Sequence, residues 1–144
     1  MNDFSQSVMI ALLPTTTDWC KIDLPHMTLV YCGEMEMLMQ GDHNELAKLA
    51  ITLAMTCSKL TLTVLGVKQF GDDQPVEVLL LRPDPQLIAM RHMVESWNAS
   101  EHPFNPHTTV GPLGSVVEEE IPDTLTFDRI AVGWGDSLLT YQLQ

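Results

Sequence analysis

The chain has 144 residues, of which 45% are hydrophobic and 18% charged, a balance that excludes intrinsic disorder and fits one folded domain spanning residues 1–144. Seven Lys and Arg stand against 19 Asp and Glu, and the resulting net charge of −12 disfavours extended binding to long DNA or RNA. A small nucleotide held at a local site is compatible with this charge.

No apolar run approaches the roughly 18 residues that cross a membrane, and the short apolar run near the N-terminus follows no basic region. Cys20, Cys32 and Cys57 are odd in number and show no metal-binding spacing. We therefore expect a cytoplasmic protein with reduced thiols and no membrane contact. The sequence does not specify an oligomeric state.

The first part of the chain predicts two strands. Residues 8–13 are apolar and end at Pro14, and residues 19–25 have the composition of a loop. Residues 26–32 are rich in Thr, Leu, Val and Tyr, which favours a strand that Gly33 stops.

From Asp42 onward the apolar period becomes helical, with Asp42 and Glu45 placed like a capping box. The apolar positions on one helix face are Leu46, Leu49, Ala50, Leu53, Ala54 and Cys57. Residues 60–67 then alternate as a strand, residues 71–73 form a turn, and residues 76–81 predict another strand.

Asp84 and Pro85 are typical of a second helix start, and Leu87, Met90, Val94 and Trp97 form its apolar stripe. After a break over residues 98–106, a strand is expected at 107–111, an acidic turn or short helix at 118–120, and a hairpin of 125–134 with 138–143. Two helices mixed with six or seven strands indicate an α+β domain with helices covering sheet faces.

A four-residue pattern occurs twice, as His26-Met27-Thr28-Leu29 and as His107-Thr108-Thr109-Val110. Successive side chains of a strand point to opposite faces, so each histidine shares a face with the threonine two residues later. Two strands folded side by side would gather two imidazoles and two hydroxyls.

Such a set suits phosphodiester cleavage, because imidazoles titrate near neutrality as base and acid while hydroxyls donate to phosphate oxygens. One copy alone would be explained as an ordinary strand or core group, but each copy follows a proline and precedes a glycine in a similar context. Phosphate-loop, GxGxxG, HExxH and GxSxG motifs are absent from the sequence.

The stretches PHMTLVYCG and FNPHTTVG resemble the two motifs of the two-histidine (2H) phosphoesterase superfamily, which includes bacterial 2'-5' RNA ligase-like proteins and cyclic phosphodiesterases. The separation of the two histidines (107 − 26 = 81 residues) is also similar, and TFDRIAVGWGDS resembles the family's terminal hairpin. The resemblance implies a bilobed, pseudo-symmetric α+β fold, with two antiparallel sheets flanking a central cleft, helices on the outside, and no metal or other cofactor.

By the same resemblance, His26 and His107 would be the acid/base pair, and Thr28 and Thr109 would hold the phosphate. The sequence leaves open which histidine is the base. Phe70 stands where relatives often have an aromatic residue near the cleft, so base stacking and core packing are both open for it. Two further substrate-binding candidates, Trp19 and Lys21, lie near the first motif.

Strand alternation predicts that Tyr31 faces away from His26. The other histidines, His43, His92 and His102, are interpreted as solvated residues rather than catalysts.

The resulting hypothesis is a metal-independent phosphodiesterase for a small nucleotide: a cyclic oligonucleotide, a 2',5'-linked oligonucleotide or a 2',3'-cyclic phosphate. Members of the family in bacteriophages and other viruses destroy nucleotide signals of host immunity. By analogy with them, the same role is a hypothesis for this protein. One alternative is an RNA-end 2',3'-cyclic phosphodiesterase or 2'-5' RNA ligase-like enzyme, for which a basic groove is expected. Another is a non-catalytic nucleotide-binding module, which would have no need of a matched acid and base.

Overall fold

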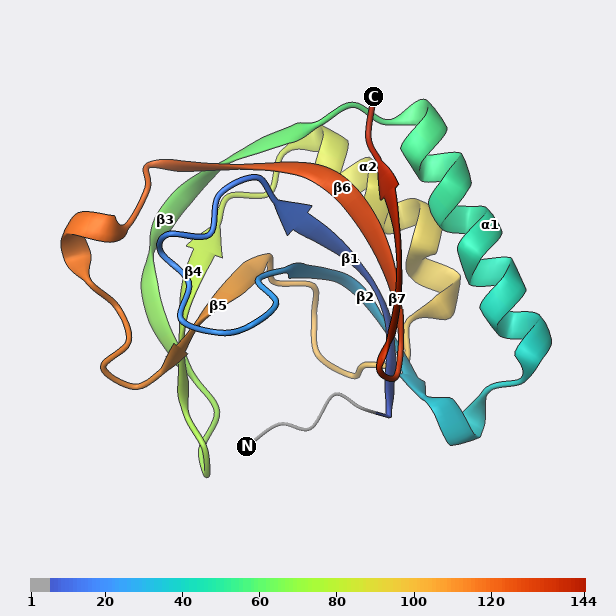
Figure 1. Cartoon of the computed structure of the whole chain (residues 1–144), viewed down its shortest axis with the longest axis horizontal. Coiled ribbons are helices and arrows are strands. Elements are labelled where there is room, and N and C mark those ends of the chain that lie inside the picture. Colours follow the sequence, from blue (N-terminus) through green and yellow to red (C-terminus); the bar gives the residue numbers. More distant parts are fainter. Residues whose placement is uncertain (1–5) are drawn as a thin grey trace.

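The computed structural model describes residues 6–144. In this part of the chain two α-helices are interspersed among seven strands (Figure 1). The strands are β1 (Ser7–Pro14), β2 (Met27–Glu34), β3 (Leu60–Phe70), β4 (Val76–Leu81), β5 (His107–Pro112), β6 (Thr124–Trp134) and β7 (Ser137–Gln142). The α-helices are α1 (Gln40–Thr56) and α2 (Pro85–Val94), with short 3-10 helices at Met35–Met37, Glu95–Trp97 and Glu118–Glu120. This content confirms the α+β class.

All strand pairs are antiparallel, in the order β2-β1-β6-β3-β4-β5. The long strands β3 and β6 each change partner along their length: β6 pairs first with β3 and then with β7, while β3 pairs first with β6 and then with β4. The two expected sheets are therefore joined into one hydrogen-bonded order through β3 and β6.

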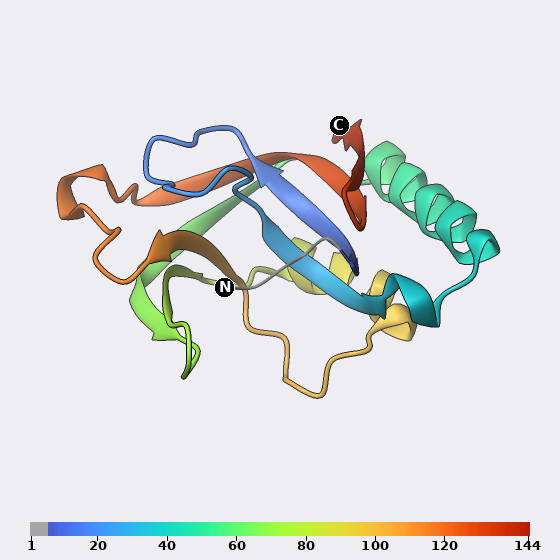
Figure 2. The same ribbon diagram turned by 60° about the horizontal axis from the view of Figure 1, so that its bottom comes forward.

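The two strands that carry the motifs, β2 and β5, are the two ends of this strand order. The sheet curls so that these ends contact each other, although four strands separate them in the order (Figures 1 and 2). The curl brings together two motifs that lie far apart in the sequence.

The two helices cover the face of the sheet that carries the buried core. Helix α1 contacts β6 and β7, and α2 contacts β2. On β1, Val8, Ile10 and Leu12 point into this core and are fully buried, whereas Met9 and Leu13 belong to the opposite face. Within residues 6–144 no helix is both long and apolar enough to span a membrane.

One of the two helices begins where the sequence predicts, and the other begins earlier. The Asp84 carboxylate accepts the N–H of Leu87 at 2.8 Å and begins α2, as the sequence predicts. Helix α1 begins earlier than expected, at Gln40, because Asp42 occupies its third position and accepts the N–H of Met39 at 2.9 Å. Asp42 still stabilises the helix start, but from inside the first turn.

Two strand ends also differ from expectation. Gly33 does not stop β2: it takes a φ of +106°, pairs with Val8, and the strand continues to Glu34. Strand β3 continues past Val67 to Phe70, because these residues pair with β4. The extension of β3 carries Phe70 to the motif strands.

Candidate active site

A cleft of about 1650 Å³ lies on the face of the sheet opposite the core, and all four motif side chains, His26, Thr28, His107 and Thr109, line it. Its floor comes from the cleft-facing positions of β1 and β6, where side chains are small or flexible: Ser7, Met9, Ala11, Leu13, Ala131 and Gly133. The structure therefore brings together the two motifs that the sequence predicts to act as one site.

The two histidines are anchored in the same way. The Nδ1 of His26 lies 2.9 Å from the carbonyl oxygen of Leu24, and the Nδ1 of His107 lies 2.7 Å from that of Asn105. In both cases the carbonyl belongs to the residue two positions earlier. Because a carbonyl can only accept, Nδ1 carries a proton in each ring, which leaves Nε2 as the atom that exchanges a proton.

The surroundings of His26 favour its neutral form. Burial lowers the pKa of His26 below its ordinary value of 6.5, and the positive charge of a protonated His107 lowers it further, while the hydrogen bond to Leu24 acts in the opposite direction. The two imidazoles are thus close enough for the charge of one to act on the other.

The threonines differ in their contacts. Within residues 6–144 the Thr28 hydroxyl donates to the Met9 sulfur, at 3.7 Å, which is a weak acceptor. Thr109 lines the cleft from β5, and its backbone oxygen accepts the Cys20 thiol at 3.7 Å. Both hydroxyls are placed beside the histidine that precedes them in the chain.

Thr108, the residue between His107 and Thr109, joins the two motifs directly. Its side chain is fully buried, and its hydroxyl donates to the backbone oxygen of His26 at 2.8 Å. The motif pattern does not indicate this contact, but strand alternation does: it turns Thr108 into the core, where a hydroxyl needs a partner.

Of the three further candidates, Phe70 and Lys21 line the cleft and Trp19 does not. The Phe70 ring meets the His107 ring edge to face, with centroids 4.7 Å apart. Trp19 is 3% exposed and packs in the core, with its indole N–H donating to the oxygen of Thr16. Its position leaves it no contact surface for a substrate in the cleft.

Lys21 reaches the cleft from the loop before β2. Its backbone N–H donates to Val110 at 2.8 Å, and its ammonium pairs with Glu120 at 2.8 Å. A side chain at Gly111 would place its Cβ 2.5 Å from the Ser115 hydroxyl and 3.3 Å from the Lys21 Cβ. The glycine after the second motif therefore lets these segments pack closely.

Tyr31, which strand alternation predicts to face away from His26, does not line the cleft with His26, but it does not keep to strict alternation along β2 either. The register of β2 against β1 shifts between Thr28 and Val30, so Leu29 has no partner and the alternation changes phase. Tyr31 consequently lines a hollow together with Thr28 and His107.

The remaining histidines differ from each other. His43 stacks on Trp134 with ring centroids 4.7 Å apart, so it is packed rather than solvated as expected. His92 is exposed on α2, as expected, and His102 lies on the loop before β5 beside the hollow.

The charged side chains around the cleft are mostly acidic. Lys21 is joined there by Asp23, Asp72, Asp73 and Asp136. A wall of this sign repels ligands that carry many negative charges.

A curled antiparallel sheet with two His-x-Thr strands facing one cleft defines the class of 2H phosphoesterases. The family model of the 2'-5' RNA ligase superfamily matches residues 22–131, and the chain belongs to this family. No curated protein matches the sequence.

Solved structures show the same fold at low sequence identity. A phosphoesterase crystal structure is 19% identical with a TM-score of 0.60, over 96% of each chain. E. coli LigT complexed with 3'-AMP is 19% identical with a TM-score of 0.57, over 96% of this chain and 95% of LigT. Kluyveromyces marxianus Usb1 is 11% identical with a TM-score of 0.67, over 96% of this chain and 99% of Usb1.

Proposed function

We propose that the protein is a metal-independent phosphodiesterase that cleaves a small nucleotide by paired-histidine acid/base catalysis. The observation that carries the proposal is the matched anchoring of His26 and His107 by carbonyls two residues upstream, with both rings lining one cleft. Family membership supports the same class of reaction.

In the proposed reaction an oxygen nucleophile, either water or a ribose hydroxyl, attacks the phosphorus. One Nε2 takes the proton of this nucleophile, the bond from phosphorus to the leaving oxygen breaks, and the other imidazolium gives its proton to that oxygen. Thr28 and Thr109 donate to the nonbridging oxygens, on which negative charge increases. The assignment of base and acid follows from the orientation of the substrate.

Phe70 and Lys21 are proposed substrate contacts. Phe70 offers a ring face or edge beside His107, and Lys21 offers a cation that a substrate phosphate would have to draw away from Glu120. Trp19 is withdrawn from this set because of its burial in the core.

A substrate panel in the presence of a chelator tests the proposal. It contains cyclic di- and trinucleotides, 2',5'-oligoadenylate, 2',3'-cyclic mononucleotides and RNA with a 2',3'-cyclic end, with products followed by chromatography. We expect cleavage of a small nucleotide with the chelator present. Loss of turnover on adding chelator would overturn the metal-free mechanism.

The same panel separates the two alternatives. Turnover restricted to RNA ends would assign an RNA-end enzyme, against which the acidic cleft wall argues. Binding without turnover of any compound would assign a nucleotide-binding module.

We extend the proposal, by analogy with viral members of the family, to the removal of a nucleotide signal of host immunity. The test is expression of the protein in cells that make a cyclic or 2',5'-linked nucleotide signal upon infection. We expect the signal to fall with the native protein and to persist with His107→Gln.

A further inference from the structure

Strand β7 is paired on one side only. It forms a hairpin with β6 (Figure 1), and no other strand within residues 6–144 pairs with it. A strand in this position leaves a row of backbone N–H and C=O groups that can accept the edge of another strand.

The hydrogen bonds around β6 show which groups of β7 face outward. In an antiparallel pair, every second residue bonds to the facing strand. The N–H of Gly135 donates to Ser7 of β1 at 2.9 Å, so the even-numbered residues of β6 bond on the other side, toward β7. Their partners are odd-numbered, as is Leu143, whose N–H donates to Asp128 at 2.9 Å. The residues of β7 whose backbone groups point away from β6 are therefore Leu138, Thr140 and Gln142.

We call the outward backbone groups of these three residues the open edge. Within residues 6–144 no hydrogen bond uses them. Pairing on this side resumes only at Gln144, whose N–H donates to Cys57 at 3.0 Å and whose oxygen accepts the N–H of Lys59 at 3.2 Å. The side chains of Leu138 and Leu139 are 42% and 38% exposed, so the strand is accessible along the open edge.

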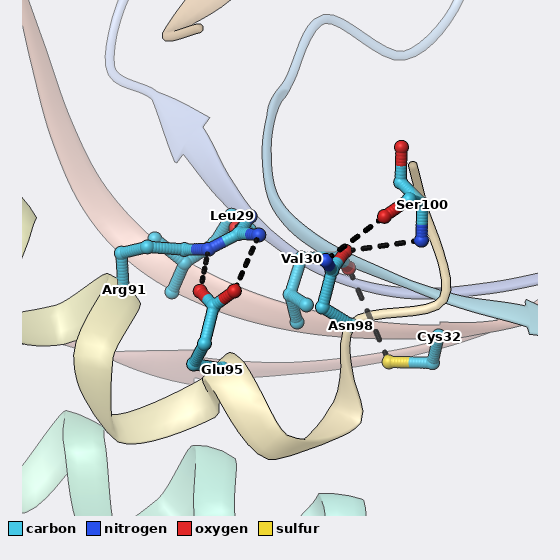
Figure 3. Close-up of polar contacts among 7 residues, drawn as sticks. All are labelled: Leu29, Val30, Cys32, Arg91, Glu95, Asn98 and Ser100. Atoms are coloured by element: carbon cyan, nitrogen blue, oxygen red, sulfur yellow. Dashed lines mark hydrogen bonds and ion pairs between the residues drawn. The ribbon is translucent and has the colours of Figure 1, made fainter. Parts of the chain in front are cut away.

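The outer strands of the sheet order are covered, in contrast to β7. On β2, the Arg91 guanidinium donates to the oxygen of Leu29 at 2.7 Å (Figure 3), and the N–H of Ala99 donates to the oxygen of Tyr31 at 2.9 Å. On β5, the loop before β2 supplies a similar bond to Val110. The fold thus covers the margins that carry the motifs and leaves β7 uncovered.

The residues of β7 do not protect the open edge either. The strand reads SLLTYQ, without a charged residue or a proline, the two devices that commonly keep an edge strand from pairing. The net charge of −12 lies outside it, so two copies of the chain repel each other where their acidic surfaces meet. A basic partner would be drawn to those acidic surfaces, whereas a second copy can approach at this neutral strand.

The open edge is also complementary to itself. An antiparallel pairing of β7 with β7 about a two-fold axis uses all three outward residues when Thr140 lies opposite Thr140 of the copy. Leu138 then lies opposite Gln142, and the three pairs form about six backbone hydrogen bonds. Leu139 lies opposite Tyr141 of the copy. Both this aliphatic–aromatic pair and the central threonine pair are of kinds that stabilise sheets.

The same register keeps the acidic turns of the two copies apart. Asp136 would lie opposite Gln144 of the copy, which separates the two Asp136 positions by about eight residues, or about 27 Å, along the strands. This separation exceeds the Debye length of about 8 Å at physiological ionic strength, so the repulsion between the turns is largely screened.

We propose that a second copy of this chain pairs with the open edge, which joins the two sheets into one continuous sheet in a dimer whose two-fold axis passes through the Thr140 pair. Ser137 and Leu138 also line the cleft, so the junction lies at the rim of each cleft. The inference concerns assembly and goes beyond the proposed activity.

Sedimentation velocity over a series of protein concentrations tests the proposal. We expect the native chain to sediment at high concentration with twice the 16.1 kDa of one chain and to dissociate on dilution. Thr140→Lys and Thr140→Glu should each raise the dissociation constant at least about fivefold, which corresponds to about 1 kcal/mol, because each places two like charges directly opposite each other.

An equimolar mixture of Thr140→Lys and Thr140→Glu should form a heterodimer with a lower dissociation constant than either variant alone, because opposite charges then meet at the axis. A variant that failed to fold could not be rescued in this way. Thr63→Lys is the matched control: it makes the same charge change at an exposed threonine of β3, which is paired with β6, and should leave the dimer intact.

A native chain that stays monomeric at every concentration would overturn the proposal and leave the open edge to a strand of another protein. A dimer that persists unchanged in both Thr140 variants, or a mixture that associates no better than its components, would equally overturn it.

Discussion

In both motifs the histidine ring bonds to a carbonyl two residues upstream, but the two motifs bury different residues between the histidine and the threonine. In β2 the intervening residue is Met27, a fully buried core side chain; in β5 it is Thr108, equally buried but bonded to the backbone of His26. The second strand thus bonds to the first motif through a side chain. In the other direction the segment before the first motif bonds to the backbone of β5, through the N–H of Lys21 to Val110 and the thiol of Cys20 to Thr109. The pattern is repeated in the sequence, while the contacts that join the two copies differ in kind.

The two histidines also have different neighbours. Burial holds the pKa of His26 below its ordinary value, and the Phe70 ring makes a T-shaped contact with His107, with centroids 4.7 Å apart. The two imidazoles therefore stand in different environments, while in the proposed reaction the orientation of the substrate decides which of them is the base. The following substitutions test how far the two motifs are equivalent.

The largest effect is expected from removing either imidazole. His26→Gln and His107→Gln should each reduce kcat on the best substrate of the panel by on the order of a hundred- to ten-thousand-fold, because each removes one proton transfer. Circular dichroism should show an unchanged fold. His92→Gln, at an exposed position on α2, is the matched control.

A variant at His26 or His107 that keeps full activity would remove that residue from the mechanism. Unequal losses in the two variants would show that one proton transfer limits the rate more than the other.

The next effect concerns the hydroxyls. Thr28→Val and Thr109→Val should each lower kcat by about a hundred- to a thousand-fold, the usual cost of one donor to a developing oxyanion, and Ser at either position should restore most of the rate. Steady-state kinetics of the four variants provide the measurement. If Val and Ser behave alike at a position, its hydroxyl does not contact the phosphate.

A smaller effect is expected at Thr108, which acts through His26. Thr108→Val keeps the shape but leaves the His26 carbonyl without its buried donor, which should cost about 1–3 kcal/mol in the free energy of unfolding. We also expect a shifted pH profile of kcat, which Thr108→Ser restores. Met27→Leu, at the corresponding position of β2, should leave the pH profile unchanged; an unchanged profile in Thr108→Val would limit that residue to a structural role.

The smallest effect is the pH dependence of stability. The folded-state pKa of His26 lies below 6.5, the ordinary value that the unfolded chain keeps. Between these two pKa values the unfolded chain binds more protons than the folded chain, so stability falls as the pH decreases through this window. Above 6.5 this contribution is constant. Urea unfolding across the window should show the slope in the native protein and a smaller slope in His26→Gln; equal slopes would contradict the shift.

The features that the sequence predicts are those governed by local periodicity. Alternation placed both His/Thr pairs on one face, and the helical period located the buried residues of α1 and α2. The joining of the two expected sheets into one depends on the long strands β3 and β6. Each of them changes its partner along its length, which is a property of the whole sheet.

The features that escaped prediction depend on tertiary context. The register shift at Leu29, which turns Tyr31 toward the site, arises where β2 adapts to β1 and has no sequence signature of its own. The contact between Thr108 and His26 spans 82 residues and exists only because the sheet curls. A pattern of single residues cannot encode either of them.

The curl of the sheet has a consequence for how the site is built. Strands β2 and β5 are the two outer margins of the strand order, so the sheet resembles a barrel left open along one seam, and the two histidines stand on opposite sides of that seam. The twist between neighbouring strands curls the sheet and so contributes to the distance between them. Residues remote from the cleft, such as Gly66 at the register shift of β3, thereby take part in setting the distance that a phosphate would have to bridge between the two histidines in the proposed reaction.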